Sequence, residues 1–367
     1  MAQRILPTQT MRREHRLSPV LPGFKALLLL GLIALLIFSF LVSLALGSVA
    51  IPLDDVVRVL LGQDASKAVW MNIILDFRLP QALTAILAGA ALGVSGLLMQ
   101  TFFRNPLADP FVLGVSSGAS LGVALVVLTI GSVTTTLLTG LGLFGDLALA
   151  AAASLGSMGV MAIVLWVARR VASGTTLLIV GLLFGYLTSA AVSVLLYFSI
   201  PERIQSYINW TFGSFSGVTW DQLIVIVPIV LAGLLAAFLL SKALNALLLG
   251  EAYAASMGVN VRHVRLAVIL TTAILAGTIT AFCGPIGFLG IAIPHFCRSL
   301  FNTSDHRSLI PLTILVGALV ALIASIIADV PGSSLVLPLN AVTSLIGAPA
   351  VIWVILSRHS VKENFAA

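Results

Sequence analysis

The sequence predicts an all-α integral membrane protein with about ten transmembrane helices. Apolar residues make up 59% of the chain and charged residues only 9%, whereas a soluble domain carries about 25% charged residues. The mean hydropathy of +1.14 agrees with this imbalance. A transmembrane helix needs about 20 apolar residues, and ten such runs, joined by short links, cover nearly the whole chain. The composition leaves almost no room for a soluble domain.

The ten candidate spans follow one another closely. The first follows a basic segment and is too long for the apolar core of a signal peptide. No Ala-x-Ala cleavage pattern is evident, so we interpret it as an uncleaved helix. The eighth is interrupted by Gly284, Pro285, Pro294, His295 and Arg298. In order, the spans are expected near 24–48, 80–103, 111–130, 146–168, 175–199, 221–242, 264–283, 285–301, 309–328 and 335–357.

The basic residues predict the orientation. With ten spans and the N-terminus inside, fifteen Lys and Arg residues fall on one side and four on the other, as the positive-inside rule expects. Segments 1–23 and 358–367 are therefore expected in the cytoplasm, at the two ends of a transmembrane domain over 24–357. This distribution accounts for the net charge of +6, so we expect no nucleic acid as a partner.

Two links outside the spans carry helical patterns. The outer link 49–79 predicts a short surface helix after Pro52, with an apolar face formed by Val56, Val57, Leu60 and Leu61. The inner link 243–265 predicts a helix of about two turns bounded by Gly250 and Gly258. A short amphipathic helix there is either a docking element or an anchor at the membrane surface. The residues alone leave both interpretations open.

A polar link between two apolar runs contains Arg104, Asn105, Pro106 and Asp109. Lipid cannot satisfy the backbone of such a segment, so it lies in water or lines a cavity. We expect Arg104 and Asp109 to form a structural ion pair.

Small residues recur at the spacing that lets helices approach closely. The pairs are Gly89 and Gly93, Gly114 and Gly118, Gly118 and Gly122, and Gly181 and Gly185. We expect them mainly at helix-packing contacts.

Several enzyme classes lack their sequence signals. There is no Gly-x-x-x-x-Gly-Lys-Ser/Thr loop and no His-Glu-x-x-His motif, so any ATP hydrolysis must occur on another subunit. Cys283 and Cys297 show no metal or redox spacing and are expected to be buried. We therefore expect no catalytic residues, bound cofactor or metal on this chain.

Two other function classes remain open from the residues. Gly93-Val-Ser95-Gly96, with His295 as a base, is similar to the serine motif of rhomboid intramembrane proteases. An ion-coupled secondary transporter would need a buried carboxylate, for which Asp109 and Asp329 are the candidates. Both lie near predicted span ends.

Several motifs in the same order closely resemble the FecCD-like permeases, the membrane subunits of type II ABC importers for iron chelates, haem and vitamin B12. The first half contains Arg78-Leu-Pro80, Gly89-Ala-Ala-Leu-Gly93-Val-Ser-Gly96, Gln100-Thr-Phe-Phe-Arg-Asn105-Pro-Leu-Ala-Asp-Pro110 and Leu113-Gly-Val-Ser-Ser-Gly-Ala119. The second contains Gly250-Glu-Ala-Tyr-Ala-Ala-Ser-Met-Gly258, Gly284-Pro-Ile-Gly287-Phe-Leu-Gly290, Ile293-Pro-His295, Asp305-His-Arg307, Leu337-Pro338 and Leu345-Ile-Gly347-Ala-Pro349. The resemblance extends over about residues 24–357.

The resemblance implies a BtuC-like ABC permease fold in the bacterial cytoplasmic (inner) membrane. It implies a homodimer with one central pathway that works by alternating access. Two cytoplasmic ABC ATPase subunits would hold ATP and Mg, and a periplasmic or lipoprotein substrate-binding protein would deliver the cargo. The cargo would be an iron chelate, such as a ferric siderophore or haem, or a corrinoid. We favour a ferric siderophore because that branch is the broadest.

The resemblance also assigns roles to residues. It favours the docking interpretation of the inner link, with ATPase-coupling residues Gly250, Glu251, Ala255 and Gly258. It puts a cytoplasmic gate at Ser173, Gly174 and Thr175, for which helix capping is the alternative. Docking of the binding protein would use Arg58, Arg78 and Arg203; Arg78 has a structural role at the start of the second span as its alternative. Structural motif residues would be Arg104, Asn105, Pro106, Asp109, Pro294, His295 and Arg298.

The chain departs from the family pattern at two positions. Gln81 stands where arginine is common after Leu-Pro, and Val336 where glutamate is common before Leu-Pro. Both departures lie on the predicted outer side and weaken the inference of docking contacts there.

Overall fold

The computed structural model describes residues 22–129, 143–170, 174–333 and 335–363, and within these ranges all regular structure is helical. Seven described helices are long and apolar enough to cross a membrane, and two shorter apolar stretches accompany them. The prediction of an all-α, multi-pass membrane protein is confirmed. The principal helices are α1 (Pro22–Ala45), α4 (Leu79–Phe103), α5 (Val115–Ala124), α7 (Leu143–Arg170), α8 (Gly174–Tyr197), α10 (Trp220–Leu239), α13 (Val261–Cys283), α14 (Leu289–Phe301), α15 (His306–Ala328) and α16 (Leu339–Glu363).

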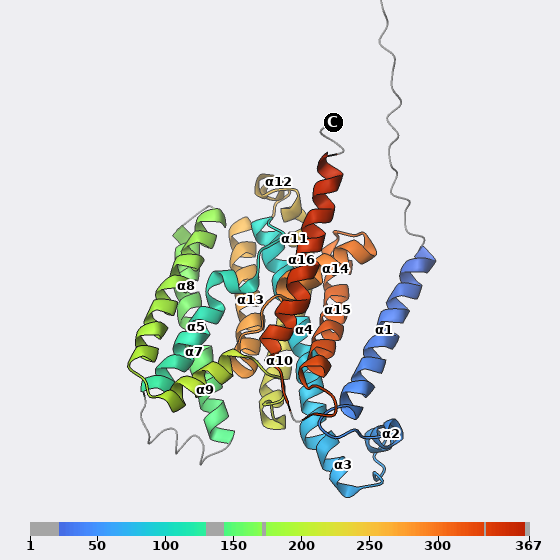
Figure 1. Cartoon of the computed structure of the whole chain (residues 1–367). Helices are drawn as coiled ribbons and strands as arrows, with labels where there is room; N and C mark the ends of the chain where they lie inside the picture. Colours follow the sequence, from blue (N-terminus) through green and yellow to red (C-terminus); the bar gives the residue numbers. More distant parts are fainter. Residues whose placement is uncertain (1–21, 130–142, 171–173, 334, 364–367) are drawn as a thin grey trace, which may run out of the picture.

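Shorter helices mark the two ends of the bundle (Figure 1). We call one the α12 end, because it carries α11 (Ser241–Leu248) and α12 (Glu251–Ser256). We call the other the α2 end, because it carries α2 (Leu53–Leu60) and α3 (Ala68–Asn72). The remaining short elements are η1 (Ile73–Arg78), which continues into α4, η2 (Pro110–Leu113), η3 (Leu125–Thr129) and α9 (Pro201–Thr211).

α4 forms the centre of the bundle. Helices α10, α13, α14 and α15 all pack against it. Within the apolar stretch Ala68–Phe103, 83% of the 18-residue segment that could cross the membrane is buried inside the protein. The corresponding share for α1, at the periphery, is 11%. Residues at the end of α4 therefore contact several helices at once.

Glycines allow α4 to cross its neighbours closely. A Cβ atom at Gly96 would lie 1.8 Å from the carbonyl oxygen of Gly290 on α14. One at Gly89 would lie 2.0 Å from the carbonyl oxygen of Gly317 on α15. No side chain fits at these distances, so the backbones are in direct contact.

The crossing of α5 and α7 uses the same arrangement. A Cβ atom at Gly118 would lie 2.5 Å from the Gly156 carbonyl oxygen, and one at Gly122 would lie 2.0 Å from that of Ala152. The packing role predicted for the spaced glycines is therefore confirmed at Gly89, Gly118 and Gly122.

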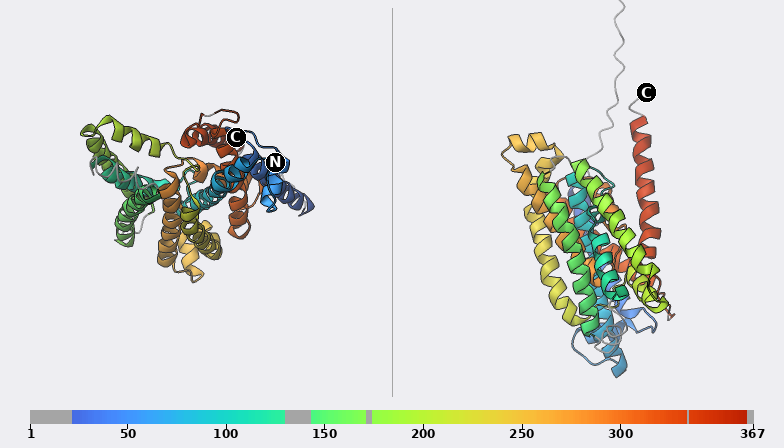
Figure 2. Two further views of the ribbon diagram at one scale, coloured as in Figure 1. Left: turned by 90° about the horizontal axis from the view of Figure 1, so that it is seen from below. Right: turned by 90° about the vertical axis from the view of Figure 1, so that its left-hand side faces the viewer.

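The bundle has one concave side. Seen along its length, α8 and α9 border this side on one flank and α16 on the other, while α10 and α13 lie on the opposite side (Figure 2). Only 22% of the segment of α8 that could cross the membrane is buried inside the protein. Its exposed apolar side chains include Ile179, Leu182, Leu183, Tyr186 and Leu187.

Two predicted elements differ in detail. The helix predicted after Pro52 is α2, but its buried apolar side chains are Val56 and Val59, and Val57 is 41% exposed. The cause lies at Asp55, which is buried because its Oδ1 atom accepts hydrogen bonds from the backbone and hydroxyl of Ser66. The face containing Asp55 and Val56 lies inward, whereas Val57, Leu60 and Leu61 of the predicted apolar face are exposed at the surface.

The eighth predicted span begins later than expected. Gly284 and Phe288 both have positive φ angles, of 74° and 67°. The backbone between them is not helical, and α14 starts at Leu289. The interruption predicted at Gly284 and Pro285 is therefore present, whereas Pro294, His295 and Arg298 lie within the helix.

Candidate functional site

α12 is a six-residue helix between two glycines at the α12 end. Gly250 has a φ of 111° and Gly258 a φ of 82°, backbone conformations that glycine adopts without steric cost. These glycines turn the chain sharply away from α11 and back into α13. On the inward side of the helix, Ala254 is fully buried and packs with Val259, Val261 and Val264.

The outward side of α12 is exposed and partly apolar. Ala255 and Gly258, both predicted coupling residues, lie on it. Tyr253 is 52% exposed and Met257 49% exposed. Tyrosine and methionine are enriched at protein interfaces, so this surface has the composition of a docking site. The sequence analysis did not select Tyr253, although an aromatic residue between small residues in a polar link is a signal that could have found it.

A salt bridge attaches α12 to the bundle. Glu251 Oε1 lies 3.3 Å from Arg265 Nη2 on α13. Arg265 is only 8% exposed, and its guanidinium carbon lies 5.8 Å from the ring centre of Phe102 on α4. Glu251 is therefore connected through Arg265 to both α13 and α4. The sequence analysis had treated Arg265 only as one of the inner positive charges.

A hydrogen-bonded chain makes a second connection from α11 to α4. Asn245 Oδ1 accepts a bond from the His306 backbone N–H at 2.9 Å and lies 2.7 Å from His306 Nδ1. The other ring nitrogen, Nε2, lies 2.7 Å from Thr101 Oγ1. His306 is 1% exposed, so this contact is shielded from water. Thr101 and His306 both lie in family motifs, but Asn245 belongs to none, and nothing in the sequence pairs these three residues.

Asp305 supports this chain at the start of α15. Its Oδ1 atom accepts hydrogen bonds from Asn245 Nδ2 at 2.5 Å and from the Arg307 backbone N–H at 3.1 Å. These bonds stabilise the carboxylate and hold the pKa of Asp305 below its ordinary value. The negative charge lies at the N-terminus of α15, where the helix dipole favours it.

Gln100 joins α4 to α14. Its Nε2 atom donates to the carbonyl oxygens of Gly290 and Ile291, at 3.3 and 3.2 Å. Its Oε1 atom accepts a bond from Arg298 Nη2. His295, also on α14, has Nε2 2.9 Å from the carbonyl oxygen of Pro106. The predicted motif residues His295 and Arg298 thus contact the end of α4 and the link that follows it.

The expected ion pair between Arg104 and Asp109 is not formed. Asp109 Oδ1 instead accepts a bond from the Phe111 backbone N–H at 2.8 Å and caps η2. Arg104 ends α4 with a φ of 48°, and its Nη1 atom lies 3.7 Å from where a Cβ atom on Gly250 would be. The turn at Arg104 directs the two side chains apart, and Arg104 lies next to the start of α12. Asn105 Oδ1 accepts from the Leu107 backbone N–H within the same link.

The three arginines predicted for docking have different environments. Arg58 is exposed on α2. Arg203 is half-buried, and its Nη1 atom donates to the Leu128 carbonyl oxygen at 3.1 Å. Arg78 is 8% exposed and donates to the carbonyl oxygens of Leu44, Ala45 and Val49. The docking role predicted for Arg78 is therefore wrong: it ties the end of α1 to the start of α4.

We expect Arg78→Ala to destabilise the protein strongly. The change would leave three carbonyl oxygens without this donor, at about 1–3 kcal/mol for each buried unsatisfied group. Thermal unfolding of the purified chain in detergent should show a clear drop in the midpoint. Arg58→Ala is the matched control and should change the free energy of unfolding by no more than about 0.5 kcal/mol. Equal effects of the two changes would contradict the structural role of Arg78.

The predicted gate lies largely outside the described residues. Ser173 is outside them, Gly174 begins α8, and the side chain of Thr175 is not among those described. The gate assignment stays a prediction. Farther along α8, Thr188 and Ser189 line a cavity of about 170 Å³ together with hydroxyl groups of α5 and α9, from Ser116, Ser117, Ser120 and Tyr207.

The two alternative function classes find no support in the geometry. Ser95 is fully buried and donates to the Ala91 carbonyl oxygen at 2.7 Å, and the bond of His295 Nε2 goes to Pro106. Neither bond joins the serine to the histidine. Asp329 accepts from Gln81 Nε2 at 2.7 Å at the C-terminus of α15, so this carboxylate belongs to a helix end. Among the described residues, no group of His, Cys, Asp and Glu could hold a metal ion.

Comparison with known proteins shows the family. The profile of the FecCD transport family matches residues 35–357. The chain belongs to this family. The FecCD resemblance inferred from the motifs is therefore confirmed, and the protein is a transport permease of the ABC type.

Relatives of this FecCD permease come from several bacteria. It is 37% identical to the hemin transport system permease protein HmuU of Yersinia pestis, over 92% of this chain and 98% of the relative. It is 36% identical to the vitamin B12 import system permease protein BtuC of Klebsiella pneumoniae subsp. pneumoniae, over 89% and 93%. It is 31% identical to YvrB of Bacillus subtilis, an uncharacterised ABC transporter permease, over 96% and 97%.

A solved structure agrees with the FecCD assignment. The fold is similar to a chain described as an inward-facing conformation of a metal-chelate type ABC transporter, with a TM-score of 0.78 and 31% sequence identity. The match covers 90% of this chain and 99% of the solved one.

Proposed function

We propose that this FecCD permease is the membrane subunit of an importer for an iron chelate, haem or a corrinoid. The observation that carries the proposal is the double connection of the α12 end to α4. The exposed surface of α12 suits a partner protein. The Glu251–Arg265 salt bridge and the Asn245–His306–Thr101 chain join it to the central helix. A push on α12 is thus transmitted to the core of the bundle.

The partner at the α12 end would be a pair of cytoplasmic ABC ATPase subunits, which hold ATP and Mg. The α12 end then faces the cytoplasm of a bacterial inner membrane, with both termini on that side. This orientation agrees with the positive-inside rule, because Arg262, Arg307 and Lys242 are all exposed at the α12 end.

The concave side bordered by α8 and α16 would form the pathway in a homodimer (Figure 2). The exposed apolar side chains of α8 suit a face that packs against a second copy. Two copies would enclose the cargo between them, and the pathway would open alternately to each side of the membrane. A binding protein would deliver the cargo at the α2 end, where Arg58 is the exposed candidate for contact with its carboxylates.

The cargo class is tested by stimulation of ATP hydrolysis. The chain, co-purified with its ATPase and binding protein in nanodiscs, would be assayed with a panel of ferric siderophores, haem and cobalamin. We expect one loaded binding protein to raise ATP hydrolysis clearly above the rate with the unloaded protein. Failure of any ATPase subunit to associate would overturn the importer proposal. Stimulation by cobalamin or haem alone would exclude the ferric siderophore that we favour.

A further inference from the structure

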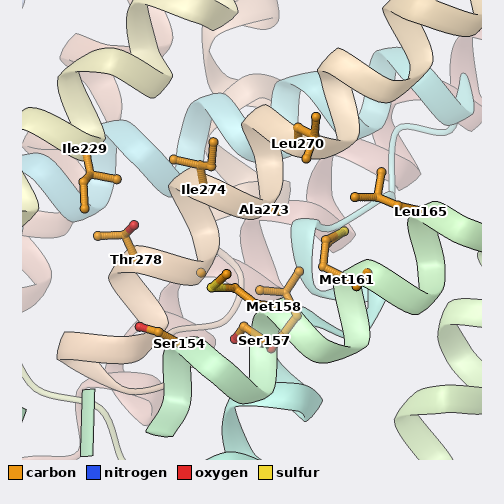
Figure 3. Close-up of a pocket in the computed structure, with 13 residues that line it drawn as sticks. Ser154, Ser157, Met158, Met161, Leu165, Ile229, Leu270, Ala273, Ile274 and Thr278 are labelled. Atoms are coloured by element: carbon orange, nitrogen blue, oxygen red, sulfur yellow. Dashed lines mark hydrogen bonds between the residues drawn. The ribbon is translucent and has the colours of Figure 1, made fainter. Parts of the chain in front are cut away.

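An apolar groove runs along the side of the bundle opposite the concave face. It has a volume of about 530 Å³ and lies on α13, between α7 and α10. In Figure 3, Ser154 and Thr278 lie at one end, and Leu165 and Leu270 lie at the other. Met158 and Met161 of α7 lie along the length of the groove, between α7 and α13.

The groove lies at membrane depth. Its residues on α7, α10 and α13 all fall within the candidate spans Ala148–Val167, Trp220–Leu239 and Val261–Cys283. At about 1.5 Å per helical residue, the distance from Ser154 to Leu165 is about 16 Å. This matches the hydrocarbon of one leaflet, about half of the 30 Å core. Hydrocarbon chains surround the protein at this depth, so the groove has the length and polarity of an acyl-chain site.

Basic residues continue the groove towards the α12 end. On α13 its lining residues recur at steps of three and four: Leu270, Ala273, Ile274, Gly277 and Thr278. The same spacing, continued towards the start of the helix, reaches Leu266 and then Arg262 and His263. Arg262 and His263 are exposed. A positive charge therefore lies on the same helical face as the groove, beyond its apolar end.

The end of α7 marks the level of the lipid headgroups beyond the groove. Arg170 is exposed, five residues beyond Leu165, and its guanidinium carbon lies 4.3 Å from the ring centre of Trp166. Trp166 is 56% exposed, and exposed tryptophan is typical of the level of lipid headgroups. Arginine suits phosphate recognition because its N–H groups form a planar donor fork. Five residues turn an α-helix by about 140°, so Arg170 faces away from the groove, and Arg262 on α13 is the arginine that lies beyond its apolar end.

We propose that this groove binds an anionic phospholipid. One acyl chain lies along Met158, Met161 and Ile274, and the phosphate of the headgroup lies at Arg262. Basic pockets between transmembrane helices on the cytoplasmic side bind acidic lipid headgroups by this chemistry. The site is separate from α12 and from the α8 and α16 face, so the proposal does not depend on the cargo.

Lipid retention in native mass spectrometry tests the site. The full chain would be released from nanodiscs that contain equal amounts of dioleoyl phosphatidylglycerol and dioleoyl phosphatidylcholine. We expect the wild-type chain to retain phosphatidylglycerol about fivefold over phosphatidylcholine. One cation near a membrane surface changes binding by about fivefold, so Arg262→Gln should weaken phosphatidylglycerol binding about fivefold. Arg307→Gln, on α15 at the same end, is the charge-matched control and should keep the preference.

A second variant tests the groove itself. Ala273→Phe fills the groove and should abolish retention of both lipids, whereas Leu231→Phe, on the exposed surface of α10, should leave it unchanged. If Ala273→Phe does not fold, Ser154→Leu at the other end serves the same purpose. Equal retention of the two lipids by the wild-type chain would overturn the proposal. So would unchanged retention in the filled variant, or an equal loss of preference in Arg307→Gln.

Discussion

Gly96→Ala is expected to abolish the folded state of this permease. The added methyl group would lie 1.8 Å from the Gly290 carbonyl oxygen, a backbone atom that cannot move without separating α4 from α14. Overpacking a core costs about 1–3 kcal/mol when side chains can adjust, and the cost here should exceed that range. Size-exclusion chromatography in mild detergent should show aggregation or loss of the folded peak. Gly89→Ala should behave in the same way, because of the Gly317 carbonyl oxygen.

The matched control is Gly159→Ala on α7. No atom lies within 4 Å of a Cβ built at this glycine, so the change adds a methyl group without a clash. Alanine also favours helix over glycine by about 1 kcal/mol. The control should therefore fold at least as well as the wild-type chain. Normal yield and an unchanged unfolding midpoint for Gly96→Ala would show that α4 and α14 are not in backbone contact.

Glu251→Arg is expected to uncouple transport from ATP hydrolysis. The new cation would face Arg265, which is nearly buried beside Phe102 on α4, and repulsion would displace α12 from the bundle. The side chain of Glu251 is 42% exposed, so solvent screens the pair, and its loss should cost no more than about 1 kcal/mol of folding stability. We expect the unfolding midpoint to change little, while ligand-stimulated ATPase activity in the assembled nanodisc complex falls at least tenfold.

The charge-exchange double variant separates two explanations. Glu251→Arg combined with Arg265→Glu restores an ion pair of the same residues in reverse order. If the pair acts by holding α12 against the bundle, the double variant should recover part of the stimulation. Ala252→Arg adds the same charge on exposed α12 without contacting this pair. Equal loss in Ala252→Arg, with no recovery in the double variant, would mean that Glu251 acts only as a surface contact.

The helical architecture was predictable because the membrane restricts the choices available to the backbone. A chain in lipid must satisfy its hydrogen bonds internally, so length and apolarity suffice to locate helices such as α10 and α15. The position of α12 was predictable for a local reason, since Gly250 and Gly258 each adopt a positive φ. The glycine pairs were predictable as packing sites, but the partners Gly290 and Gly317 lie far away in the chain and were not.

The roles of charged residues were less predictable. Arg265 looked like one inner cation among fifteen, yet it is buried and joins α12 to α4. Arg104 and Asp109 looked like an ion pair because they are close in sequence, but the turn after α4 separates their side chains. The groove and Arg262 combine residues more than ninety positions apart, and no motif links them.

Composition and local spacing are therefore enough to establish the helical class, the membrane location and the FecCD resemblance, because each depends on residues close together in the chain. Three-dimensional packing was needed to separate charges that maintain the fold from charges available to partners. Arg58 and Arg78 are both isolated arginines on the same predicted side, yet one is exposed and the other donates to three backbone carbonyl groups. Those acceptors belong to the end of α1 and the loop after it, and folding brings them to Arg78.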